Sequence, residues 1–446
     1  MGDLMKVILG GMAGPVFLIL GFLMMFQLLR ILNIDAAPVV SVMVALSPIW
    51  IPLTLFYVTF EKWMYHVQLK FVHDNGRTTL RIHLPQEVFK SPEAMESVLA
   101  QIHNVSSPDN LMQTYLDGRH PLTFSFELVS IGGEVRFYIN VPTKKSKNAV
   151  EAQLYAQYPG IEIVEEQFDY ADEIQWNPDK YEIMSFHMTK KKDDVLPIKT
   201  YIDFGMDRLP KEEVEKFEPM AAMIEQMSKL KPYERVWVQI LATPHVERNF
   251  KNGSLRTIPT WTKKGEEKIN EMLKRDERLS SDPEEDFERA PMLTMGERDT
   301  VAAIERNIGK YAYDVGIRWM YITEKGKFDS NFISPMIRSF AQYDIITRNS
   351  LGIKWRTDFD YNFLSDRSGR RKNAWKKSEL YDYKNRYYYV RDRKTWLDKE
   401  KTMSVEELAT MFHIPGSSVI TPSMPRIMST RKSAPPNLPT GLIKSI

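Results

Sequence analysis

Residues 122–141 read LTFSFELVSIGGEVRFYINV and predict a β-hairpin. Both arms, Leu122–Ser130 and Glu134–Val141, are rich in the β-branched and aromatic residues that strands favour. Between them, Gly132 and Gly133 supply the left-handed backbone that a tight hairpin turn requires. An antiparallel pair of strands is therefore expected here.

The segments on either side of this hairpin complete a βαββαβ order. Before it, Thr79–Leu84 alternates as a strand does, and Ser91–His103 begins with an N-cap serine and a proline, as helices often do. After it, Lys144–Tyr158 has a helical pattern and Ile161–Val164 is a short strand. Because this order is that of the ferredoxin-like fold, residues 66–175 are predicted to form a ferredoxin-like α+β domain.

A second α+β domain is predicted over residues 176–415. Its pattern is less regular, and a charged helical insertion occupies residues 262–294. We expect a second ferredoxin-like unit that carries this insertion. Strands are expected at Tyr181–Met188, Lys199–Phe204, Arg235–Ala242 and Tyr313–Ile322, and helices at Val214–Leu230, Thr262–Leu279, Thr294–Gly309 and Ser330–Tyr343. Residues 416–446 are dense in Ser, Pro, Thr and Arg and predict an extended C-terminal arm.

The first sixty residues contain two long stretches without a charged side chain, Val7–Leu29 and Ala36–Phe60. Each is long enough to cross a hydrocarbon core of about 30 Å, which takes roughly 20 helical residues. A secretory signal peptide and a buried helical hairpin are the alternatives. The first stretch is too long for a signal peptide and lacks a cleavage site, and neither stretch has the polar stripe of a soluble helix. Residues 1–65 are therefore predicted to form a transmembrane helical hairpin.

The charges that flank this hairpin predict its orientation. Lys6 precedes it, and Lys62 and Lys70 follow it, so the positive-inside rule places both chain ends in the cytoplasm. The expected localisation is the cytoplasmic (inner) membrane, as a multi-pass protein whose soluble part faces the cytoplasm.

The sequence predicts no catalytic site, no metal and no cofactor, so the protein is not expected to be an enzyme. The cysteine count of 0 excludes disulfides, thiolate metal sites and cysteine nucleophiles. No stretch matches the phosphate-binding loop G-x-x-x-x-G-K-[ST], the dinucleotide fingerprint G-x-G-x-x-G or the nucleophile motif G-x-S-x-G. The 8 histidines show no metal-ligand spacing.

A basic and aromatic segment covers residues 367–396. Its part from Arg367 to Lys394 carries eleven Lys or Arg residues against three acids, with tyrosines and tryptophans between them. Cations that follow a phosphate backbone and rings that stack on bases are typical of single-strand binding. The alternatives are a partner-binding or structural β-ribbon and contact with anionic lipid. The candidate binding residues are Arg367, Arg370, Arg371, Lys372, Trp375, Lys376, Lys377, Arg391 and Arg393.

Several strings resemble one family of bacterial proteins. They are PEAME (92–96) with IH (102–103), FSFEL (124–128) running into SIGGEVRFYI (130–139), VEAQLYAQYP (150–159), SVEELATMFHIP (404–415) and RKSAPPNLP (431–439). They resemble the membrane-anchored N-terminal region of conjugative DNA-transfer ATPases of the type IV secretion kind. In that family a proline-rich arm leads into a FtsK/HerA-like motor, which has no counterpart in this sequence.

The resemblance implies a non-enzymatic, membrane-anchored scaffold of a type IV secretion-like machine that transfers DNA or another macromolecule. Such a subunit would dock a separate HerA-like motor ATPase or form an oligomeric ring, so the expected partners are the membrane, further copies of the chain, that ATPase and DNA. The alternative is a membrane-tethered nucleic-acid-binding protein that uses residues 367–394.

Overall fold

The computed structural model describes residues 37–85, 90–104, 107–207, 218–247, 249–255, 260–273, 293–360, 366, 368–387, 401–416 and 425–427. The chain divides into two compact units. The first contains residues 1–69 and 389–394, and the second contains the rest of the chain, including the whole sheet.

The first unit contains the helix α2 (Ala37–Ala45) and most of α3 (Ser47–Asn75). These helices contradict the predicted transmembrane hairpin, because no helix in the described part of the chain is long and apolar enough to cross a membrane. The second predicted span, Ala36–Phe60, is interrupted at Leu46, so that α2 has 9 residues and a length of about 14 Å. The first predicted span, 7–29, lies outside the described residues.

The start of α3 explains this interruption. Pro48 lies in the first turn of α3, where the missing N–H of proline is not needed, so it begins a new helix instead of continuing α2. The apolar part of α3 ends at Phe60, and Glu61 and Lys62 follow within the same helix. The predicted localisation as a multi-pass membrane protein is contradicted by the same finding.

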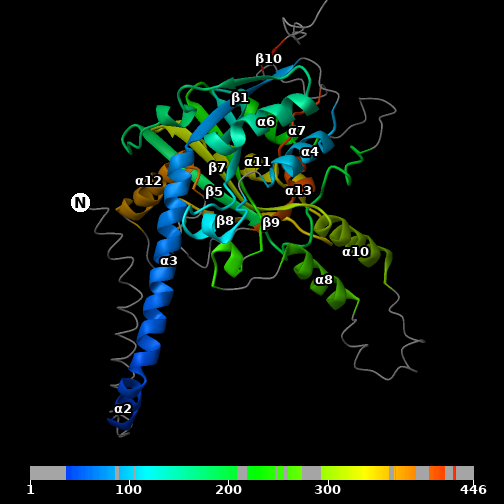
Figure 1. Ribbon diagram of the computed structural model, residues 1–446. Coiled ribbons are helices and arrows are strands. Elements are labelled where there is room, and N and C mark those ends of the chain that lie inside the picture. The colour runs from blue at the N-terminus through cyan, green and yellow to red at the C-terminus, as the bar shows by residue number, and fades with distance from the viewer. Residues whose placement is uncertain are drawn as a thin grey trace, which may run out of the picture. The chain divides into compact units, whose positions relative to one another are not determined.

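The second unit is an α+β body built on one sheet of 10 strands (Figure 1). Its first half contains β1 (Arg77–Pro85), β2 (Phe124–Ile131), β3 (Glu134–Pro142) and β4 (Glu162–Glu165), with α4 (Glu93–Ile102) and α6 (Thr143–Gln157) as the two connecting helices. These strands lie in the order β4-β1-β3-β2 and all neighbours are antiparallel. The elements thus follow the βαββαβ order along the chain.

The second half of this unit has the same order of strands, read in the opposite direction across the sheet. The strands β5 (Tyr181–Lys190), β6 (Glu234–Pro244), β7 (Ala312–Glu324) and β8 (Leu351–Arg356) lie in the order β6-β7-β5-β8. The two halves join where β2 pairs with β6, from Phe124 opposite Ala242 to Ile131 opposite Arg235. The segments predicted as two α+β domains therefore share one continuous sheet.

Some predicted elements of the second half differ in the structure. Lys199–Phe204 forms turns instead of a strand, and the Asp203 carboxylate accepts the Thr200 N–H at 2.9 Å. Ser330–Tyr343 is divided into three short helices instead of one. The remaining helices are α5 (Leu111–Tyr115), η1 (Tyr170–Glu173), α7 (Ala221–Ser228), η3 (Phe250–Asn252), α8 (Trp261–Met272), α10 (Met295–Ile308), η4 (Ser330–Phe332), α11 (Ile333–Arg338), η5 (Ala341–Tyr343), α12 (Arg370–Lys384) and α13 (Val405–Met411).

Both faces of the sheet are covered. On one face a large apolar core packs beneath α4, α6, α7, α11 and α13 (Figure 1). On the other face a smaller core includes Trp237 of β6, Tyr170 of η1, and Leu380 and Tyr383 of α12. Because successive strand residues point to opposite faces, each central strand contributes to both cores.

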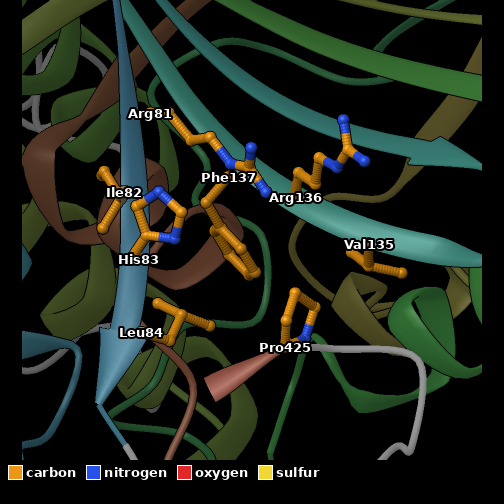
Figure 2. Close-up of a pocket in the computed structure, with 8 residues that line it drawn as sticks. All are labelled: Arg81, Ile82, His83, Leu84, Val135, Arg136, Phe137 and Pro425. Carbon is orange, nitrogen blue, oxygen red and sulfur yellow. The ribbon is translucent and has the colours of Figure 1, made fainter. Parts of the chain in front are cut away.

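The C-terminal residues return to the sheet at two places. The strand β9 (Lys401–Ser404) pairs antiparallel with β7 and leads into α13. The strand β10 (Arg426–Ile427) pairs parallel with the end of β1, with Leu84 opposite Arg426 and Pro85 opposite Ile427. Figure 2 shows Pro425 between Leu84 of β1 and Val135 of β3, where these two strands diverge.

Candidate functional site

The segment predicted to bind nucleic acid or a partner contains the helix α12. Six of the predicted binding residues lie on this helix: Arg370, Arg371, Lys372, Trp375, Lys376 and Lys377. The other three, Arg367, Arg391 and Arg393, lie outside the described residues. Residues 370–384 are helical, so they do not form the β-ribbon that was the structural alternative.

Three of the predicted side chains interact within the protein. The Asp360 carboxylate lies 2.8 Å from Arg371 Nη2 and 2.9 Å from Lys372 Nζ. The Arg371 guanidinium also lies over the Trp375 ring, 5.1 Å from its centroid, and Trp375 meets Trp355 of β8 edge-on. These contacts hold the start of α12 against its neighbours.

The outward stripe of α12 carries Arg370, Lys377 and Tyr381, which are all exposed. Separations of seven and four residues return to the same side of a helix, so these three side chains share one face. Lys376, next to this stripe, is half-buried, and burial lowers the pKa of its ammonium group although nearby Glu182 opposes the shift. The predicted set is therefore divided between a surface stripe and structural contacts.

The buried side of α12 contains a carboxylate, Glu379. Its Oε1 lies 2.6 Å from His187 Nε2 and 3.0 Å from Arg318 Nη1, and all three side chains are buried. Burial alone would raise the pKa of Glu379, but the charges and hydrogen bonds of His187 and Arg318 outweigh it and lower that pKa to about 2. The helix is thus fixed to β5 and β7 through an ionised carboxylate.

A row of polar side chains continues from this point across the sheet. Glu127 of β2 stands opposite Gln239 of β6, Gln239 stands opposite Arg318 of β7, and Arg318 stands opposite His187 of β5. Gln239 Nε2 donates to Glu127 Oε1 at 3.0 Å, and Arg318 Nε donates to Gln239 Oε1 at 3.2 Å. The row crosses the β2–β6 junction and so links the two halves of the sheet.

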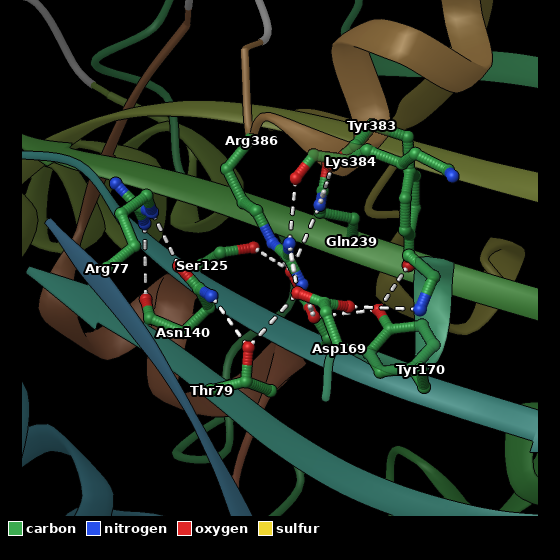
Figure 3. A network of polar contacts seen from close by, with 12 residues as sticks. Arg77, Thr79, Ser125, Asn140, Asp169, Tyr170, Gln239, Tyr383, Lys384 and Arg386 are labelled. Carbon is green, nitrogen blue, oxygen red and sulfur yellow. Dashed lines mark hydrogen bonds and ion pairs between the residues drawn. The ribbon is translucent and has the colours of Figure 1, made fainter. Parts of the chain in front are cut away.

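Arg386, just after α12, completes this network (Figure 3). Its Nε and Nη2 donate to the two Glu127 carboxylate oxygens at 3.0 and 3.2 Å, and its Nη1 forms an ion pair with Asp169. Tyr170 donates its hydroxyl to Glu127 Oε2 at 2.7 Å and lies 2.8 Å from the Tyr383 hydroxyl. Arg386 has a φ of +55°, a left-handed conformation that is unfavourable for arginine, so these contacts hold it there.

The charges in this network stabilise one another. Burial would raise the pKa of Glu127, but the adjacent Arg386 holds it below its usual value, and Glu127 in turn raises the pKa of Arg386. Burial and the nearby Arg386 charge lower the pKa of Arg77, at the edge of the network, to about 10. Removing one partner of such a pair leaves a buried, uncompensated charge, which costs about 3–5 kcal/mol.

A second buried ion pair anchors α13. Lys190 Nζ lies 2.8 Å from Glu407 Oε1, and both side chains are fully buried. Glu407 also accepts the Ile198 N–H at 2.9 Å and forms a capping box with Ser404. The string 404–415 quoted above is therefore a tightly held structural element between β9 and the C-terminal segment.

A surface depression of about 470 Å³ opens at one end of β5, β6 and β7. It is lined by Lys180, Tyr181, Tyr233, Arg235 and Lys325, among others. Acidic groups neutralise its rim, because Glu324 lies 2.7 Å from Lys327, and Glu173 lies 3.4 Å from Arg235. Its mixed charge does not favour one class of ligand.

Sequence reasoning missed the buried network, although it carries one recognisable sign. Glu127 lies in the middle of the apolar strand FSFEL, and Arg318 lies within IRW in another strand. A charged residue inside an otherwise apolar strand predicts a buried partner of opposite charge. Within the described residues, no group of three or more His, Asp or Glu side chains is arranged to hold a metal ion.

Comparison with known proteins places the chain in a family. No curated protein matches it. A family model described as "Domain of unknown function (DUF8128)" matches residues 65–426. That description names no function, so the predicted place in type IV secretion or conjugation has no support from it. Since the match covers most of the sequence and β1 to β9 of the sheet, the chain belongs to the DUF8128 family.

Proposed function

We propose that this protein is a non-catalytic structural subunit that docks another protein in a larger assembly. The observation that carries the proposal is the buried network beneath α12. Its groups best suited to acid–base chemistry are Glu127, His187 and Glu379, and all three are buried from solvent. Glu127 is paired with Arg386, and Glu379 is paired with both Arg318 and His187. A buried, paired network of this kind fixes the relative position of elements, which is what a rigid platform requires.

The platform consists of two βαββαβ halves in one sheet, covered on both faces and linked by the polar row. Following the family resemblance, the docked protein we propose is a separate HerA-like motor ATPase. The proline-rich residues after Ile427 are the segment that we expect to contact it, because proline-rich segments are a common recognition element for other proteins.

The test is purification of the tagged full-length chain from its own cells under native conditions. We expect a complex much heavier than the 52.0 kDa chain that contains an ATPase. A chain without residues 428–446 should lose that ATPase and keep its thermal unfolding temperature. A 52.0 kDa monomer without an ATPase, or nucleotide hydrolysis by the isolated chain, would overturn the proposal.

Nucleic-acid binding is the second candidate function, and the exposed stripe of Arg370, Lys377 and Tyr381 favours it. Replacing Arg370 and Lys377 together by Ala should then lower the salt-dependence slope of single-stranded DNA binding by about 1.4, at about 0.7 for each phosphate contact. The matched control replaces Arg371 and Lys372, which are paired with Asp360. Equal effects of the two double variants would argue against the stripe as the binding surface.

A further inference from the structure

The end of β1 is incomplete without the C-terminal segment. Pairing of β1 with β3 ends at Ile82 opposite Phe137, and pairing with β4 ends at His83 opposite Glu162. Leu84 is nevertheless buried, at 2% exposure, so its backbone groups require a hydrogen-bonding partner. The described residue that pairs with it is Arg426 of β10.

The site that receives β10 has a defined lining, which we call the β1–β3 fork. It is formed by Arg81, Ile82, His83 and Leu84 of β1 and by Val135, Arg136 and Phe137 of β3, and Pro425 of the bound segment lies beside them (Figure 2). A cavity of about 10 Å³ lies between these residues and Pro425. The fork therefore holds the chain's own extended segment by parallel strand pairing.

Arg426 fixes the segment in this site. Its Nη2 donates to the Gly416 carbonyl at 2.9 Å and its Nη1 to the Pro85 carbonyl at 3.4 Å. The Gly416 N–H in turn donates to Glu218, whose other carboxylate oxygen lies 2.6 Å from His413. Partial burial of the guanidinium lowers the pKa of Arg426.

We infer that the β1–β3 fork is an exchangeable peptide site whose occupant in the assembled protein is the Pro425–Ile427 segment of a second copy of the chain. The inference rests on the proposed scaffold function and names one of its partners. Three features of the chain support exchange instead of permanent intramolecular pairing.

The first feature is the small contact: β10 has 2 residues and pairs with β1 at two positions. Such a short strand opens more easily than the body of the sheet.

The second feature is the length of the connection, since the eight residues 417–424 join Gly416 to the segment and can span up to about 28 Å when extended. The third feature is that every copy of the chain carries the same segment and the same fork. Pairing within one chain and pairing between two copies therefore make the same contacts and differ only in the path of the connecting residues.

Because the sequence contains no cysteine, two introduced cysteines can be tested for a disulfide without competing native thiols. Pro85 and Ile427 are opposite each other, so a cysteine at each position would form a disulfide across the pair. We would co-express a chain carrying Pro85→Cys with a differently tagged chain carrying Ile427→Cys, and oxidise them. Exchange predicts a covalent heterodimer of about twice 52.0 kDa with the 85–427 link found by peptide mass spectrometry.

Two controls make each outcome decisive. In the first control, a chain carrying Ile346→Cys takes the place of the chain carrying Pro85→Cys. Ile346 is 93% exposed and far from the fork in sequence, so this pair of chains should give at least tenfold less heterodimer. The Arg426→Ala change in the Ile427→Cys chain should reduce the heterodimer severalfold, whereas Arg426→Lys should retain part of it.

The inference is overturned if Pro85→Cys with Ile427→Cys in one chain closes within that chain while the mixed chains give no heterodimer. That result would leave the proposed scaffold function intact, because docking of the ATPase is measured separately by the native mass of the complex. If cysteine variants unfold, light scattering of Arg426→Ala against the unaltered chain decides: an unchanged mass overturns exchange.

Discussion

Arg386 and Glu127 are 259 residues apart in the sequence, yet the arginine donates two hydrogen bonds to the carboxylate, at 3.0 and 3.2 Å. The pair joins the end of α12 to the central strand β2. Its two side chains are almost completely buried, with exposures of 4% and 0%. The position of α12 over the sheet therefore depends on this ion pair.

Glu127→Gln should lower the free energy of unfolding by about 3–5 kcal/mol, because it removes the more deeply buried of the two carboxylates that pair with Arg386 and leaves only Asp169. Urea denaturation followed by tryptophan fluorescence measures this loss. Lys327→Ala is the control, since it removes an exposed ion pair with Glu324 and should leave the denaturation midpoint unchanged. Similar losses in both variants would mean that the buried pair is not important for stability.

Glu379 predicts a specific acid dependence of stability. Its pKa is about 2 in the folded protein, against an ordinary value of 4.5, so its stabilising effect is complete above about pH 4.5 and is lost as the pH falls toward 2. The difference in unfolding free energy between the unaltered chain and Glu379→Gln should shrink over this pH range. A constant difference from pH 5 to pH 2.5 would contradict the assignment.

Lys190→Met should destabilise the protein more than the double change Lys190→Met with Glu407→Met. The single change leaves the Glu407 carboxylate buried without its cation, whereas the double change removes both charges. Burial already raises the pKa of Glu407 despite Lys190 and the hydrogen bonds from the Ile198 and Ser404 N–H groups, so losing Lys190 disfavours the charged carboxylate further. A double-mutant cycle by chemical denaturation measures the coupling. A double variant less stable than the single one would show that the Glu407 cap matters more than the pair.

Gly133→Ala should destabilise the central hairpin. Gly133 has a φ of +93°, and a Cβ atom there would lie 2.7 Å from the Ser228 carbonyl oxygen. Gly326→Ala is matched in backbone, with a φ of +78°, but has no atom within 4 Å of its Cβ position. We expect the thermal unfolding temperature to fall several degrees further for Gly133→Ala than for Gly326→Ala. Equal decreases in the unfolding temperature would mean that the Ser228 carbonyl moves away from the added Cβ atom at little cost.

The hairpin could be predicted from sequence because its information is local. The strands predicted at Leu122–Ser130 and Glu134–Val141 agree closely with Phe124–Ile131 and Glu134–Pro142, since Gly132 and Gly133 fix the turn between them. By contrast, the strand predicted at Lys199–Phe204 was wrong, because this segment forms turns in which the Asp203 carboxylate accepts the Thr200 N–H. Residues that favour strands do not by themselves ensure a neighbouring strand.

The candidate site could be predicted only in part. The composition of α12 is visible in the sequence, but which of its cations face solvent depends on Asp360, Glu379 and the sheet beneath. The pairing of Glu127 with Arg386 depends on how α12 packs against the sheet, which cannot be predicted from one sequence. The predicted second membrane span was wrong because hydropathy averages over Leu46–Pro48, where one helix ends and the next begins.

The β2–β6 junction has a consequence for synthesis of the chain on the ribosome. Once residues up to Glu165 have emerged, the first half can form its four strands, but the edge of β2 stays open until β6 is made. That strand ends at Pro244, and the intervening 79 residues take about 4–16 s at 5–20 residues per second. During this interval a long, apolar edge is available to neighbouring nascent chains. Slowing translation between Glu165 and Pro244 should therefore increase aggregation, whereas slowing it after Ile427 should not.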